Sequence, residues 1–421
     1  MNEHSASVNG ISIYSLTNPN LRSFCLSLYV RAGSIFEDIS NNGISHLFEH
    51  VVFRNIKNKY ENFYELLAMH GLCFQGSTYK KFVSFTIDGP QHEFDFAIEI
   101  LCGLFDEIKL TSHDFNNEKG RIKAEIREKD RRSSLDFCFD SVVWKNSEVE
   151  KIVLGYCKTI DRVSVKKINE FRQKVLSAGN CFVYATGNIS DENLDALNKK
   201  ISELDISQSN PGFTNTVTVN NEFFHREKKI WIKNNYWHYI QIGFDVDCSK
   251  YPGGVYDLLY ALLFNGDKAL VYNYLSEDNP IIYSYDSTFE QYDNVGNINF
   301  SFEVDRNKIE DVFKTVVELL NAAKDGRFNF EANLNYEMFN WELDLDNPDN
   351  LNWNMAYYNH ILKTQPIDYS DEFYGRFRVT KEQIIDAAKY IFRRCNMTVA
   401  VKGDRKKINA EAIEKILESL D

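Results

Sequence analysis

Segments with an apolar residue at every second position alternate along this chain with segments of helical periodicity. In residues 239–244, Tyr-Ile-Gln-Ile-Gly-Phe, every second side chain is aliphatic or aromatic, which predicts a half-buried β-strand. Residues 25–30 are also strand-like, whereas the polar run Asn116–Arg132 predicts a helix with Ile122 and Ile126 on one side. We therefore predict an α+β fold in which helices pack on a mixed or antiparallel sheet.

A helix–strand unit occurs twice in the sequence, at a constant offset of 216 residues. The equivalent pairs are Val163 and Val379, Ser164 and Thr380, Ile168 and Ile384, Asn180 and Asn396, and Gly187 and Gly403. Each copy predicts a hydroxyl N-cap, an amphipathic helix and a strand that ends at glycine. We therefore expect two homologous domains, residues 1–205 and 221–421, joined by a linker at 206–220 that is rich in Ser, Asn, Pro and Gly.

Composition excludes several classes of protein. With 421 residues, of which 43% are hydrophobic and 14% aromatic, the chain is globular and long enough for two to three domains. A net charge of −13 argues against nucleic acid or an anionic membrane as a partner and suits basic or neutral peptides. The eight cysteines are scattered without a C-x-x-C pair, which predicts reduced, mostly buried thiols. The polar N-terminus lacks the apolar region of a signal peptide, so we expect a cytoplasmic protein.

The sequence His46-Leu47-Phe48-Glu49-His50 places chemistry-bearing side chains on one helical turn. His46 and His50 are four residues apart, so both imidazoles project from the same face of a helix. Glu49 lies beside that face, where a general base stands to take a proton from a water molecule at a metal ion. The order H-x-x-E-H is the inverse of H-E-x-x-H and is the signature of the inverzincins.

An ordinary solvent-exposed helix face is the alternative interpretation of this trio. The surroundings favour a site, because the loop Asn41–Gly43 leads to Ser45, which we expect to be the N-cap directly before His46. After the motif, the apolar residues 51–53, Val-Val-Phe, anchor the helix in a core.

A catalytic zinc site requires a third protein ligand and an open position for water. Candidates lie in the run Asn116–Arg132, which contains Glu118, Glu125 and Glu128. Glu118 and Glu125 are seven residues apart and so share a helix face. Taken alone, this run is better interpreted as a solvent-exposed charged helix.

The segments AGSIFED at 32–38 and NGISHLFEHVVF at 42–53 resemble the zinc site of the pitrilysin-type metallopeptidases, which include insulin-degrading enzyme and the mitochondrial processing peptidase. In that family the third ligand is a Glu about 75 residues after the second His, and a supporting Glu precedes it by seven. The resemblance therefore implies His46, His50 and Glu125 as ligands of one Zn²⁺ per chain, Glu49 as the base, and Glu118 as the residue that orients the ligands. It also implies a duplicated α+β fold.

The second half departs from the family pattern in one place. The family has an Arg and a Tyr seven residues apart, and the aligned positions here are Ser276 and Tyr283. Tyr283 is expected to donate a hydrogen bond to the substrate carbonyl, although a half-buried strand aromatic is an equally good interpretation. The missing Arg leaves the zinc chemistry intact but puts the completeness of the substrate site in question.

A short segment resembles the strand on which the family binds peptides. Gln75, Gly76, Ser77 and Thr78 precede the strand-like residues 82–87 and align with the family pattern Asn-Ala-x-Thr. A peptide would bind there by adding a strand to the edge of the sheet. A plain hairpin strand is the structural alternative.

The motif and the family resemblance together imply a zinc-dependent endopeptidase that hydrolyses peptides in an enclosed chamber. The alternative is a non-catalytic binding or assembly subunit of the same family. By resemblance, we expect either a homodimer or a heterodimer, in which this chain is the zinc-bearing subunit and a related chain supplies the Arg–Tyr pair. A hydrolase of non-peptide substrates has no sequence feature in its favour.

Overall fold

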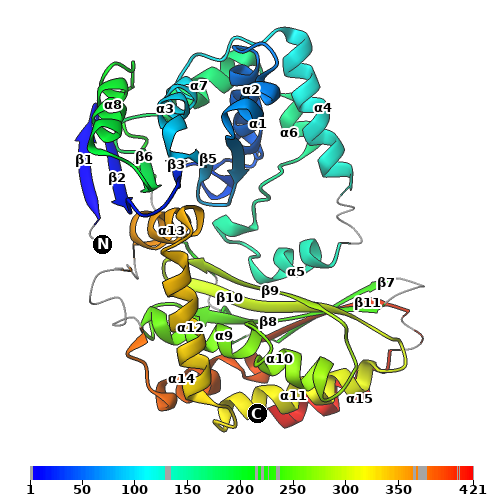
Figure 1. The fold of residues 1–421 in the computed structure, drawn as a ribbon. Coiled ribbons are helices and arrows are strands. Elements are labelled where there is room, and N and C mark those ends of the chain that lie inside the picture. The colour runs from blue at the N-terminus through cyan, green and yellow to red at the C-terminus, as the bar shows by residue number, and fades with distance from the viewer. Residues whose placement is uncertain are drawn as a thin grey trace. The chain divides into compact units, whose positions relative to one another are not determined.

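The computed structural model describes residues 3–128, 134–213, 217–219, 222–225, 227–233, 238–363, 367, 377–404, 406 and 408–420. Parts of the predicted linker, residues 214–216 and 220, and the end of the predicted helical run, residues 129–132, lie outside them. The chain divides into two compact units (Figure 1). Unit 1 comprises Met1–Lys129, Lys151–Asn215 and Glu342–Ser370, and unit 2 comprises Asp130–Glu150, Thr216–Trp341 and Asp371–Asp421.

Unit 1 contains a six-stranded sheet in the order β1-β2-β6-β3-β5-β4, in which β2 and β6 are parallel and the other pairs are antiparallel. Its strands are β1 (His4–Val8), β2 (Ile11–Thr17), β3 (Ser23–Val30), β4 (Cys73–Thr78), β5 (Val83–Pro90) and β6 (Cys181–Gly187). Its longer helices are α1 (Ile44–Lys57), α2 (Phe63–His70), α3 (Phe94–Gly103), α4 (Ser112–Glu128), α6 (Cys157–Asp161), α7 (Val165–Val175), α8 (Asp191–Ser202), α13 (Pro348–Met355) and the π-helix η5 (Ala356–Leu362).

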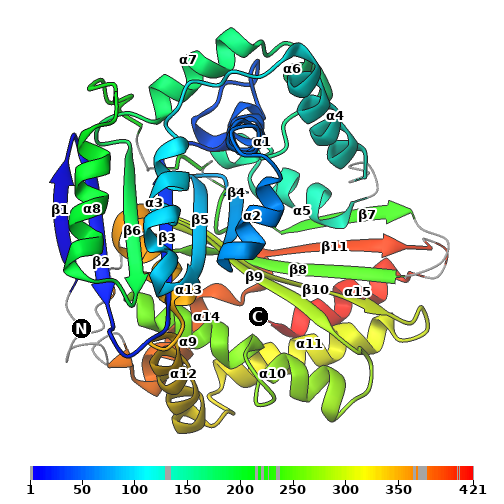
Figure 2. The same ribbon diagram turned by 45° about the horizontal axis from the view of Figure 1, so that its top comes forward.

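Both faces of the unit 1 sheet are covered by helices. Strand β3 is buried along nearly its whole length, and its residues alternate between the two faces. Leu26 and Leu28 pack in a core cluster with Leu47 and Phe48 of α1. Figure 2 shows α3 and α8 running along the strands on one face of this sheet. On the opposite face, α13 contacts β3 and β6.

Unit 2 contains a five-stranded sheet in the order β7-β11-β8-β10-β9, in which only β7 and β11 are parallel among the described strands. Its strands are β7 (Lys228–Lys233), β8 (His238–Asp247), β9 (Tyr285–Tyr292), β10 (Val295–Val304) and β11 (Met397–Gly403). Its helices are α5 (Leu135–Val143), α9 (Gly253–Phe264), α10 (Leu270–Tyr272), the π-helix η4 (Asn273–Glu277), α11 (Ile309–Lys324), most of α12 (Phe330–Asp344), α14 (Lys381–Ile391) and α15 (Ala410–Leu417).

The predicted α+β duplication is confirmed by the matching topology of the two sheets. Strands β2, β6, β3, β5 and β4 of unit 1 correspond in order and direction to β7, β11, β8, β10 and β9 of unit 2. The offset of 216 residues holds in detail, because Ser164 and Thr380 both cap the helix that follows them. Asn180 donates a hydrogen bond to the carbonyl of Val175, and Asn396 donates the equivalent bond to Ile391, at 2.8 and 2.9 Å.

The compact units differ from contiguous domains of residues 1–205 and 221–421. Helix α5 is carried by the first half but packs on β8 and β11 of unit 2, and α13 is carried by the second half but belongs to unit 1. The two helices hold equivalent places in the duplicated order, between α4 and α7 and between α12 and α14. The physical reason is burial, since each sheet has a second face that its own half leaves without a helix.

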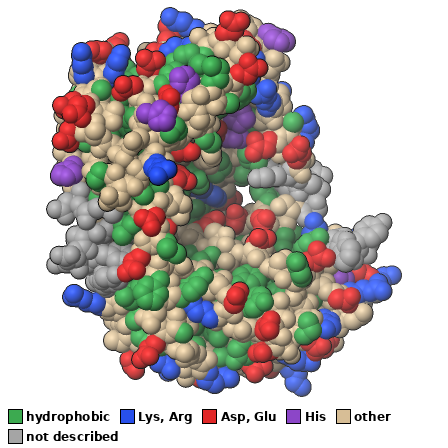
Figure 3. All heavy atoms as spheres, viewed as in Figure 1, with side chains coloured by type: hydrophobic (Ala, Val, Ile, Leu, Met, Phe, Trp, Pro, Cys, Tyr) green, Lys and Arg blue, Asp and Glu red, His purple; other side chains and the backbone are tan. Residues whose placement is uncertain are grey.

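The structure also bears on the cysteines, on membrane-spanning helices and on the surface charge. All eight cysteines are free thiols, but only Cys25, Cys181 and Cys248 are buried, so the prediction of mostly buried thiols is wrong. No helix in the described part of the chain is long and apolar enough to cross a membrane. On the face drawn in Figure 3, acidic and basic side chains are interspersed among the described residues.

Candidate metal centre

Helix α1 begins two residues earlier than its sequence suggests. Gly43 is the N-cap, with φ of 94° in the left-handed region that glycine adopts without strain. The expected capping role of Ser45 is therefore wrong. Its hydroxyl instead accepts a hydrogen bond of 2.9 Å from the backbone N–H of Gly33, which ties the preceding loop to the first turn of the helix.

Glu37 caps α1 in place of Ser45. One carboxylate oxygen accepts hydrogen bonds from the backbone of Gly43 and the side chain of Asn42, at 2.7 and 2.8 Å. The other accepts from the backbone N–H of Ser45 at 2.8 Å. Burial raises the pKa of Glu37, and these hydrogen bonds act in the opposite direction. A buried carboxylate thus satisfies the open N–H groups at the start of the helix that carries the motif.

The two faces of α1 have different surroundings. Leu47, Phe48 and Val51 are fully buried in the core of unit 1, which fixes the rotation of the helix. His46 and His50 project from the other face, with ring centroids 4.7 Å apart and planes at 86°. Since His46 is only 7% exposed, the interpretation of this trio as an ordinary solvent-exposed face is wrong.

Helix α4 brings the acidic side chains to the histidines. It is not a solvent-exposed helix throughout, because Phe115, Ile122 and Glu118 on it are buried. Oε2 of Glu125 lies 3.7 Å from Nε2 of His46, and Oε2 of Glu118 lies 3.5 Å from Nδ1 of His50. Both glutamates therefore face α1, as their spacing of seven residues predicts.

His46, His50 and Glu125 form a group that fits a metal ion. One potential ligand atom from each lies within 4.8 Å of the other two. Two imidazoles and a carboxylate are a donor set that zinc uses in catalytic sites. Glu128, the remaining candidate, is exposed and does not belong to this group.

Glu118 lies beside His50 and outside the group of three potential ligands. It is 2% exposed and faces Nδ1 of His50, which leaves Nε2 of that ring for a metal. Arg54 and Arg121 lie 3.8 and 3.4 Å from its other oxygen. Burial opposes protonation of His50, but the hydrogen bond and charge of Glu118, together with Glu49, outweigh it and raise the pKa of the ring. The same carboxylates attract a divalent cation.

Glu49 lies beside the three candidate ligands and outside their group. Its Oε2 is 4.0 Å from Nε2 of His46 and accepts a hydrogen bond of 2.8 Å from the hydroxyl of Thr78. Burial raises the pKa of this carboxyl, and Glu125 acts in the same direction, whereas His50 and Thr78 lower it. The position and the partial burial are those of a general base.

The segment Gln75–Thr78 lies on β4, which pairs with β5 on one side and forms the edge of the unit 1 sheet. It is thus both the expected edge strand and one strand of a hairpin. A Cβ atom at Gly76 would lie 3.0 Å from Oε1 of Glu49, so the departure from the family Ala leaves room beside the carboxylate.

Tyr283 and Ser276 belong to unit 2. Ser276 lies on the π-helix η4, and Tyr283 lies between η4 and β9 with 96% of its surface exposed. The alternative interpretation of Tyr283 as a half-buried strand aromatic is therefore wrong. Its role toward a substrate stays a prediction.

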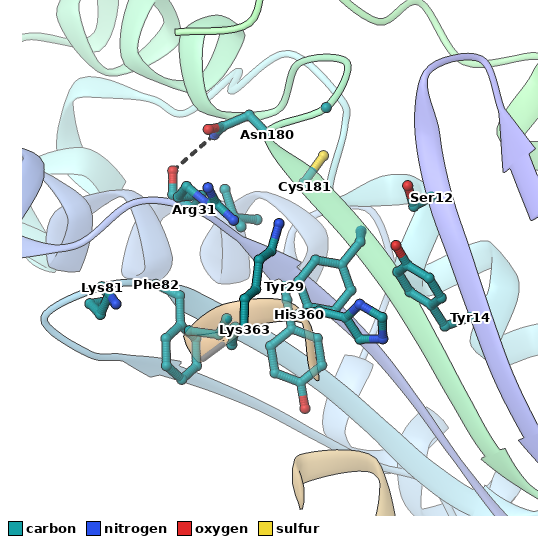
Figure 4. Close-up of a pocket in the computed structure, with 14 residues that line it drawn as sticks. Ser12, Tyr14, Tyr29, Arg31, Lys81, Phe82, Asn180, Cys181, His360 and Lys363 are labelled. Atoms are coloured by element: carbon teal, nitrogen blue, oxygen red, sulfur yellow. Dashed lines mark hydrogen bonds between the residues drawn. The ribbon is translucent and has the colours of Figure 1, made fainter. Parts of the chain in front are cut away.

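A separate pocket of unit 1 contains none of the predicted site residues (Figure 4). Arg31, Lys81, Lys363 and His360 line it, and the His360 ring stacks on Tyr14 with centroids 3.7 Å apart. Sequence analysis missed this pocket because its lining comes from several segments that only the fold brings together.

Two family models match most of the chain. Residues 13–154 match the model described as insulinase (peptidase family M16), and residues 162–332 match the one described as peptidase M16 inactive domain. Among relatives, an uncharacterized zinc protease, YmxG, of Bacillus subtilis is 21% identical over 75% of this chain and 77% of its own length. The mitochondrial-processing peptidase subunit beta of Saccharomyces cerevisiae is 23% identical, over 44% of this chain and 41% of its own length.

Solved structures share the fold. A protease from Helicobacter pylori has a TM-score of 0.83 at 18% identity, with 96% of this chain and 99% of that chain covered. The first half of the periplasmic protease PqqL from Escherichia coli has a TM-score of 0.78 at 13% identity, with 99% and 96% covered. Both the sequence matches and the duplicated fold lead to one conclusion: the chain belongs to the M16 family of peptidases.

Proposed function

We propose that this chain is a zinc-dependent endopeptidase that binds one zinc ion through His46, His50 and Glu125. The observation that carries the proposal is the convergence of these three donors beside a partly buried carboxylate, Glu49, which is not one of them. A structural metal site needs no such base. Relatives named zinc proteases support the assignment of the metal.

Zinc bound in this site would supply a Lewis acid that polarises the scissile carbonyl and lowers the pKa of water. The chain's own residues supply the remaining functions. Glu49 takes the proton of the attacking water and passes it to the leaving amine. Thr78 holds the Glu49 carboxylate in place through its hydrogen bond, and Glu118 fixes the orientation of the His50 ring.

Substrate peptides would pair with the free edge of β4. That edge runs beside Glu49. The hydroxyl of Thr78 donates a hydrogen bond to the Glu49 carboxylate, and Gly76 lies close to the same side chain. Main-chain pairing is tolerant of sequence, so size and conformation would be the main filters. Tyr283 is the proposed donor to the substrate carbonyl, and an enclosed chamber is the proposed setting.

A second candidate function is that of a non-catalytic binding or assembly subunit. Two observations favour it: Ser276 stands where the family resemblance places an Arg, and residues 162–332 match a model described as an inactive domain. The complete donor set with Glu49 favours catalysis. A heterodimer, in which a related chain supplies the Arg–Tyr pair, reconciles both sets of observations.

Metal analysis combined with cleavage of a quenched fluorescent peptide library tests the proposal. We expect about one zinc per chain, cleavage within peptides, loss of cleavage on chelation and recovery on addition of zinc. A chain that binds zinc and peptides but cuts none, alone or with a related subunit, would be the non-catalytic subunit instead.

A further inference from the structure

The two faces of edge strand β4 have different surroundings. Phe74 packs in the core of unit 1, and Thr78 and Gly76 lie against Glu49 of α1. Because side chains alternate along a strand, Gln75 and Ser77 point to the opposite face of the sheet. There they line a cavity of about 390 Å³, which we call the acidic groove.

The acidic groove lies between the β4–β5 hairpin and the helices α12 and α13. Asp88 reaches it from β5, Asp344 from the end of α12 and Asp349 from the first turn of α13. Among the described residues that line it, none is Lys, Arg or His. Burial raises the pKa of the Asp88 carboxyl, and the charge of Asp349 adds to this effect. The groove therefore concentrates negative charge without a basic side chain in its lining.

Aromatic rings form one wall of the same groove. Trp353 lies one turn after Asp349 on α13, and its ring is 5.2 Å from that of Tyr79. Rings of this kind attract a cation over their faces and pack against the aliphatic stem of a long basic side chain. Carboxylates combined with aromatic rings select a long basic side chain more strongly than an acidic surface alone does.

Ser84 is an independent sign that the groove receives a polar group. It lies opposite Ser77 in the β4–β5 ladder, on the face of β5 turned away from the buried Phe85. Ser84 is only 5% exposed, yet its hydroxyl has no hydrogen-bond partner among the described residues. Because Ser84 lines the groove, this hydroxyl can donate a hydrogen bond to, or accept one from, a polar ligand there.

We propose that the acidic groove is a specificity pocket that binds a Lys or Arg side chain of a peptide paired with β4. This inference rests on the proposed function, because it requires β4 to hold a peptide. Strand geometry adds a constraint: a residue whose side chain enters the groove alternates with residues that face α1 and Glu49. The preference for a basic residue must therefore appear only at every second position of the bound peptide.

Peptide binding to the zinc-loaded Glu49→Gln chain tests this inference without requiring cleavage. The probe is a fluorescein-labelled peptide that the unaltered chain cuts, prepared with Lys, norleucine or Glu at each position in turn. Norleucine matches the stem of Lys without its charge. At every second position of the peptide, we expect the Lys peptide to bind about tenfold tighter than the norleucine peptide. At the positions between them, the two peptides should bind equally. Fluorescence anisotropy gives each dissociation constant.

Substitutions in the groove locate the preference. In the Glu49→Gln background, Asp349→Asn should reduce the ratio of norleucine to Lys dissociation constants from about ten to about one. Because Asp349 lies in the first turn of α13, Ser77→Lys provides a second route, placing a cation in the groove from the edge strand. The control Asp195→Asn makes the same charge change at an exposed position of α8 and should leave the ratio unchanged.

The outcomes separate the two proposals. A Lys preference lost in both groove variants supports the pocket. Equal binding of Lys and norleucine at every position, or a preference that survives both variants, overturns it, while cleavage of norleucine peptides by the unaltered chain still upholds the endopeptidase. If the Glu49→Gln chain binds none of the peptides, the pocket is also rejected.

Discussion

The hydroxyl of Thr78 on edge strand β4 donates a hydrogen bond of 2.8 Å to Oε2 of Glu49 on α1. The strand proposed to bind the substrate thereby also holds the proposed base. Replacement by Val keeps the shape of the side chain and removes the donor. We expect Thr78→Val to lower kcat about tenfold at unchanged zinc content, since a hydrogen bond to a charged group contributes about 1.5–3 kcal/mol. Thr78→Ser should retain most of the activity.

Separate substitutions should distinguish the base from the ligands. Glu49→Gln is expected to keep about one zinc per chain and to lose at least about a hundredfold in kcat, because the base is gone while the donors remain. His50→Ala and Glu125→Ala should lose zinc as well. The control Glu128→Gln alters an exposed glutamate of the same helix as Glu125 and should change neither property. Full activity of Glu49→Gln would show that the assigned mechanism is wrong.

Glu37 should matter for the start of α1 and through it for the metal centre. In Glu37→Gln, one of the two accepting oxygens becomes an NH₂ group that faces the N–H donors of Gly43 or Ser45. We expect a loss of about 2 kcal/mol in the free energy of unfolding and a weaker affinity for zinc. Urea unfolding and competition with a zinc chelator measure the two effects. Asp38→Asn, at the exposed neighbouring position, should behave as the unaltered chain does.

Helix α13 belongs to unit 1 but is carried by the second half of the chain. The stability of unit 1 should therefore depend on contacts that this helix makes. Asn352 is fully buried, accepts a hydrogen bond of 2.9 Å from the Tyr29 hydroxyl and donates to the carbonyl of Tyr184 at 3.0 Å. Asn352→Leu leaves those groups without partners and should lower the free energy of unfolding by about 3 kcal/mol. The exposed Asn350→Leu is the control, and it should cost less than about 1 kcal/mol.

This placement of α13 also makes a simple truncation informative. Residues 1–213 expressed alone lack α13, so one face of their sheet is uncovered, and we expect a chain that aggregates or binds a hydrophobic dye. Co-expression with residues 222–421 should restore a soluble complex. A truncated first half that folds as a stable monomer would contradict the importance of the exchanged helix.

Ser276 leads to a prediction about assembly. If a related subunit supplies the Arg–Tyr pair, the purified chain should have weak peptidase activity that rises on addition of a relative that lacks H-x-x-E-H but keeps this pair. Ser276→Arg should raise the activity of the chain alone, because it restores the missing cation seven residues before Tyr283. Full activity of the isolated chain, unchanged by a partner or by this substitution, would indicate a homodimer in which Ser276 is a neutral replacement.

Features that depend on local periodicity were predictable from the sequence. The spacing of His46 and His50 placed both rings on one helix face, and the spacing of Glu118 and Glu125 placed both carboxylates on another. The 216-residue offset predicted two related α+β halves, because helix caps and strand ends have local signatures. In each case the prediction depends only on the geometry of a single element. A helix has 3.6 residues per turn, and side chains alternate along a strand.

Long-range contacts decided the rest. Glu37 caps α1 across a loop, at a distance in sequence that matches no capping pattern, so Ser45 was the better local candidate and the wrong one. Nothing in the order of helices indicates that α5 and α13 change places, because the exchange depends on which sheet face remains to be buried. The acidic groove likewise joins Asp88 to Asp349, which lie far apart in the sequence. The sequence alone determined the elements and the zinc-binding motif, and only the tertiary structure decided which side chains surround them, since burial and hydrogen bonding are satisfied between segments rather than within them.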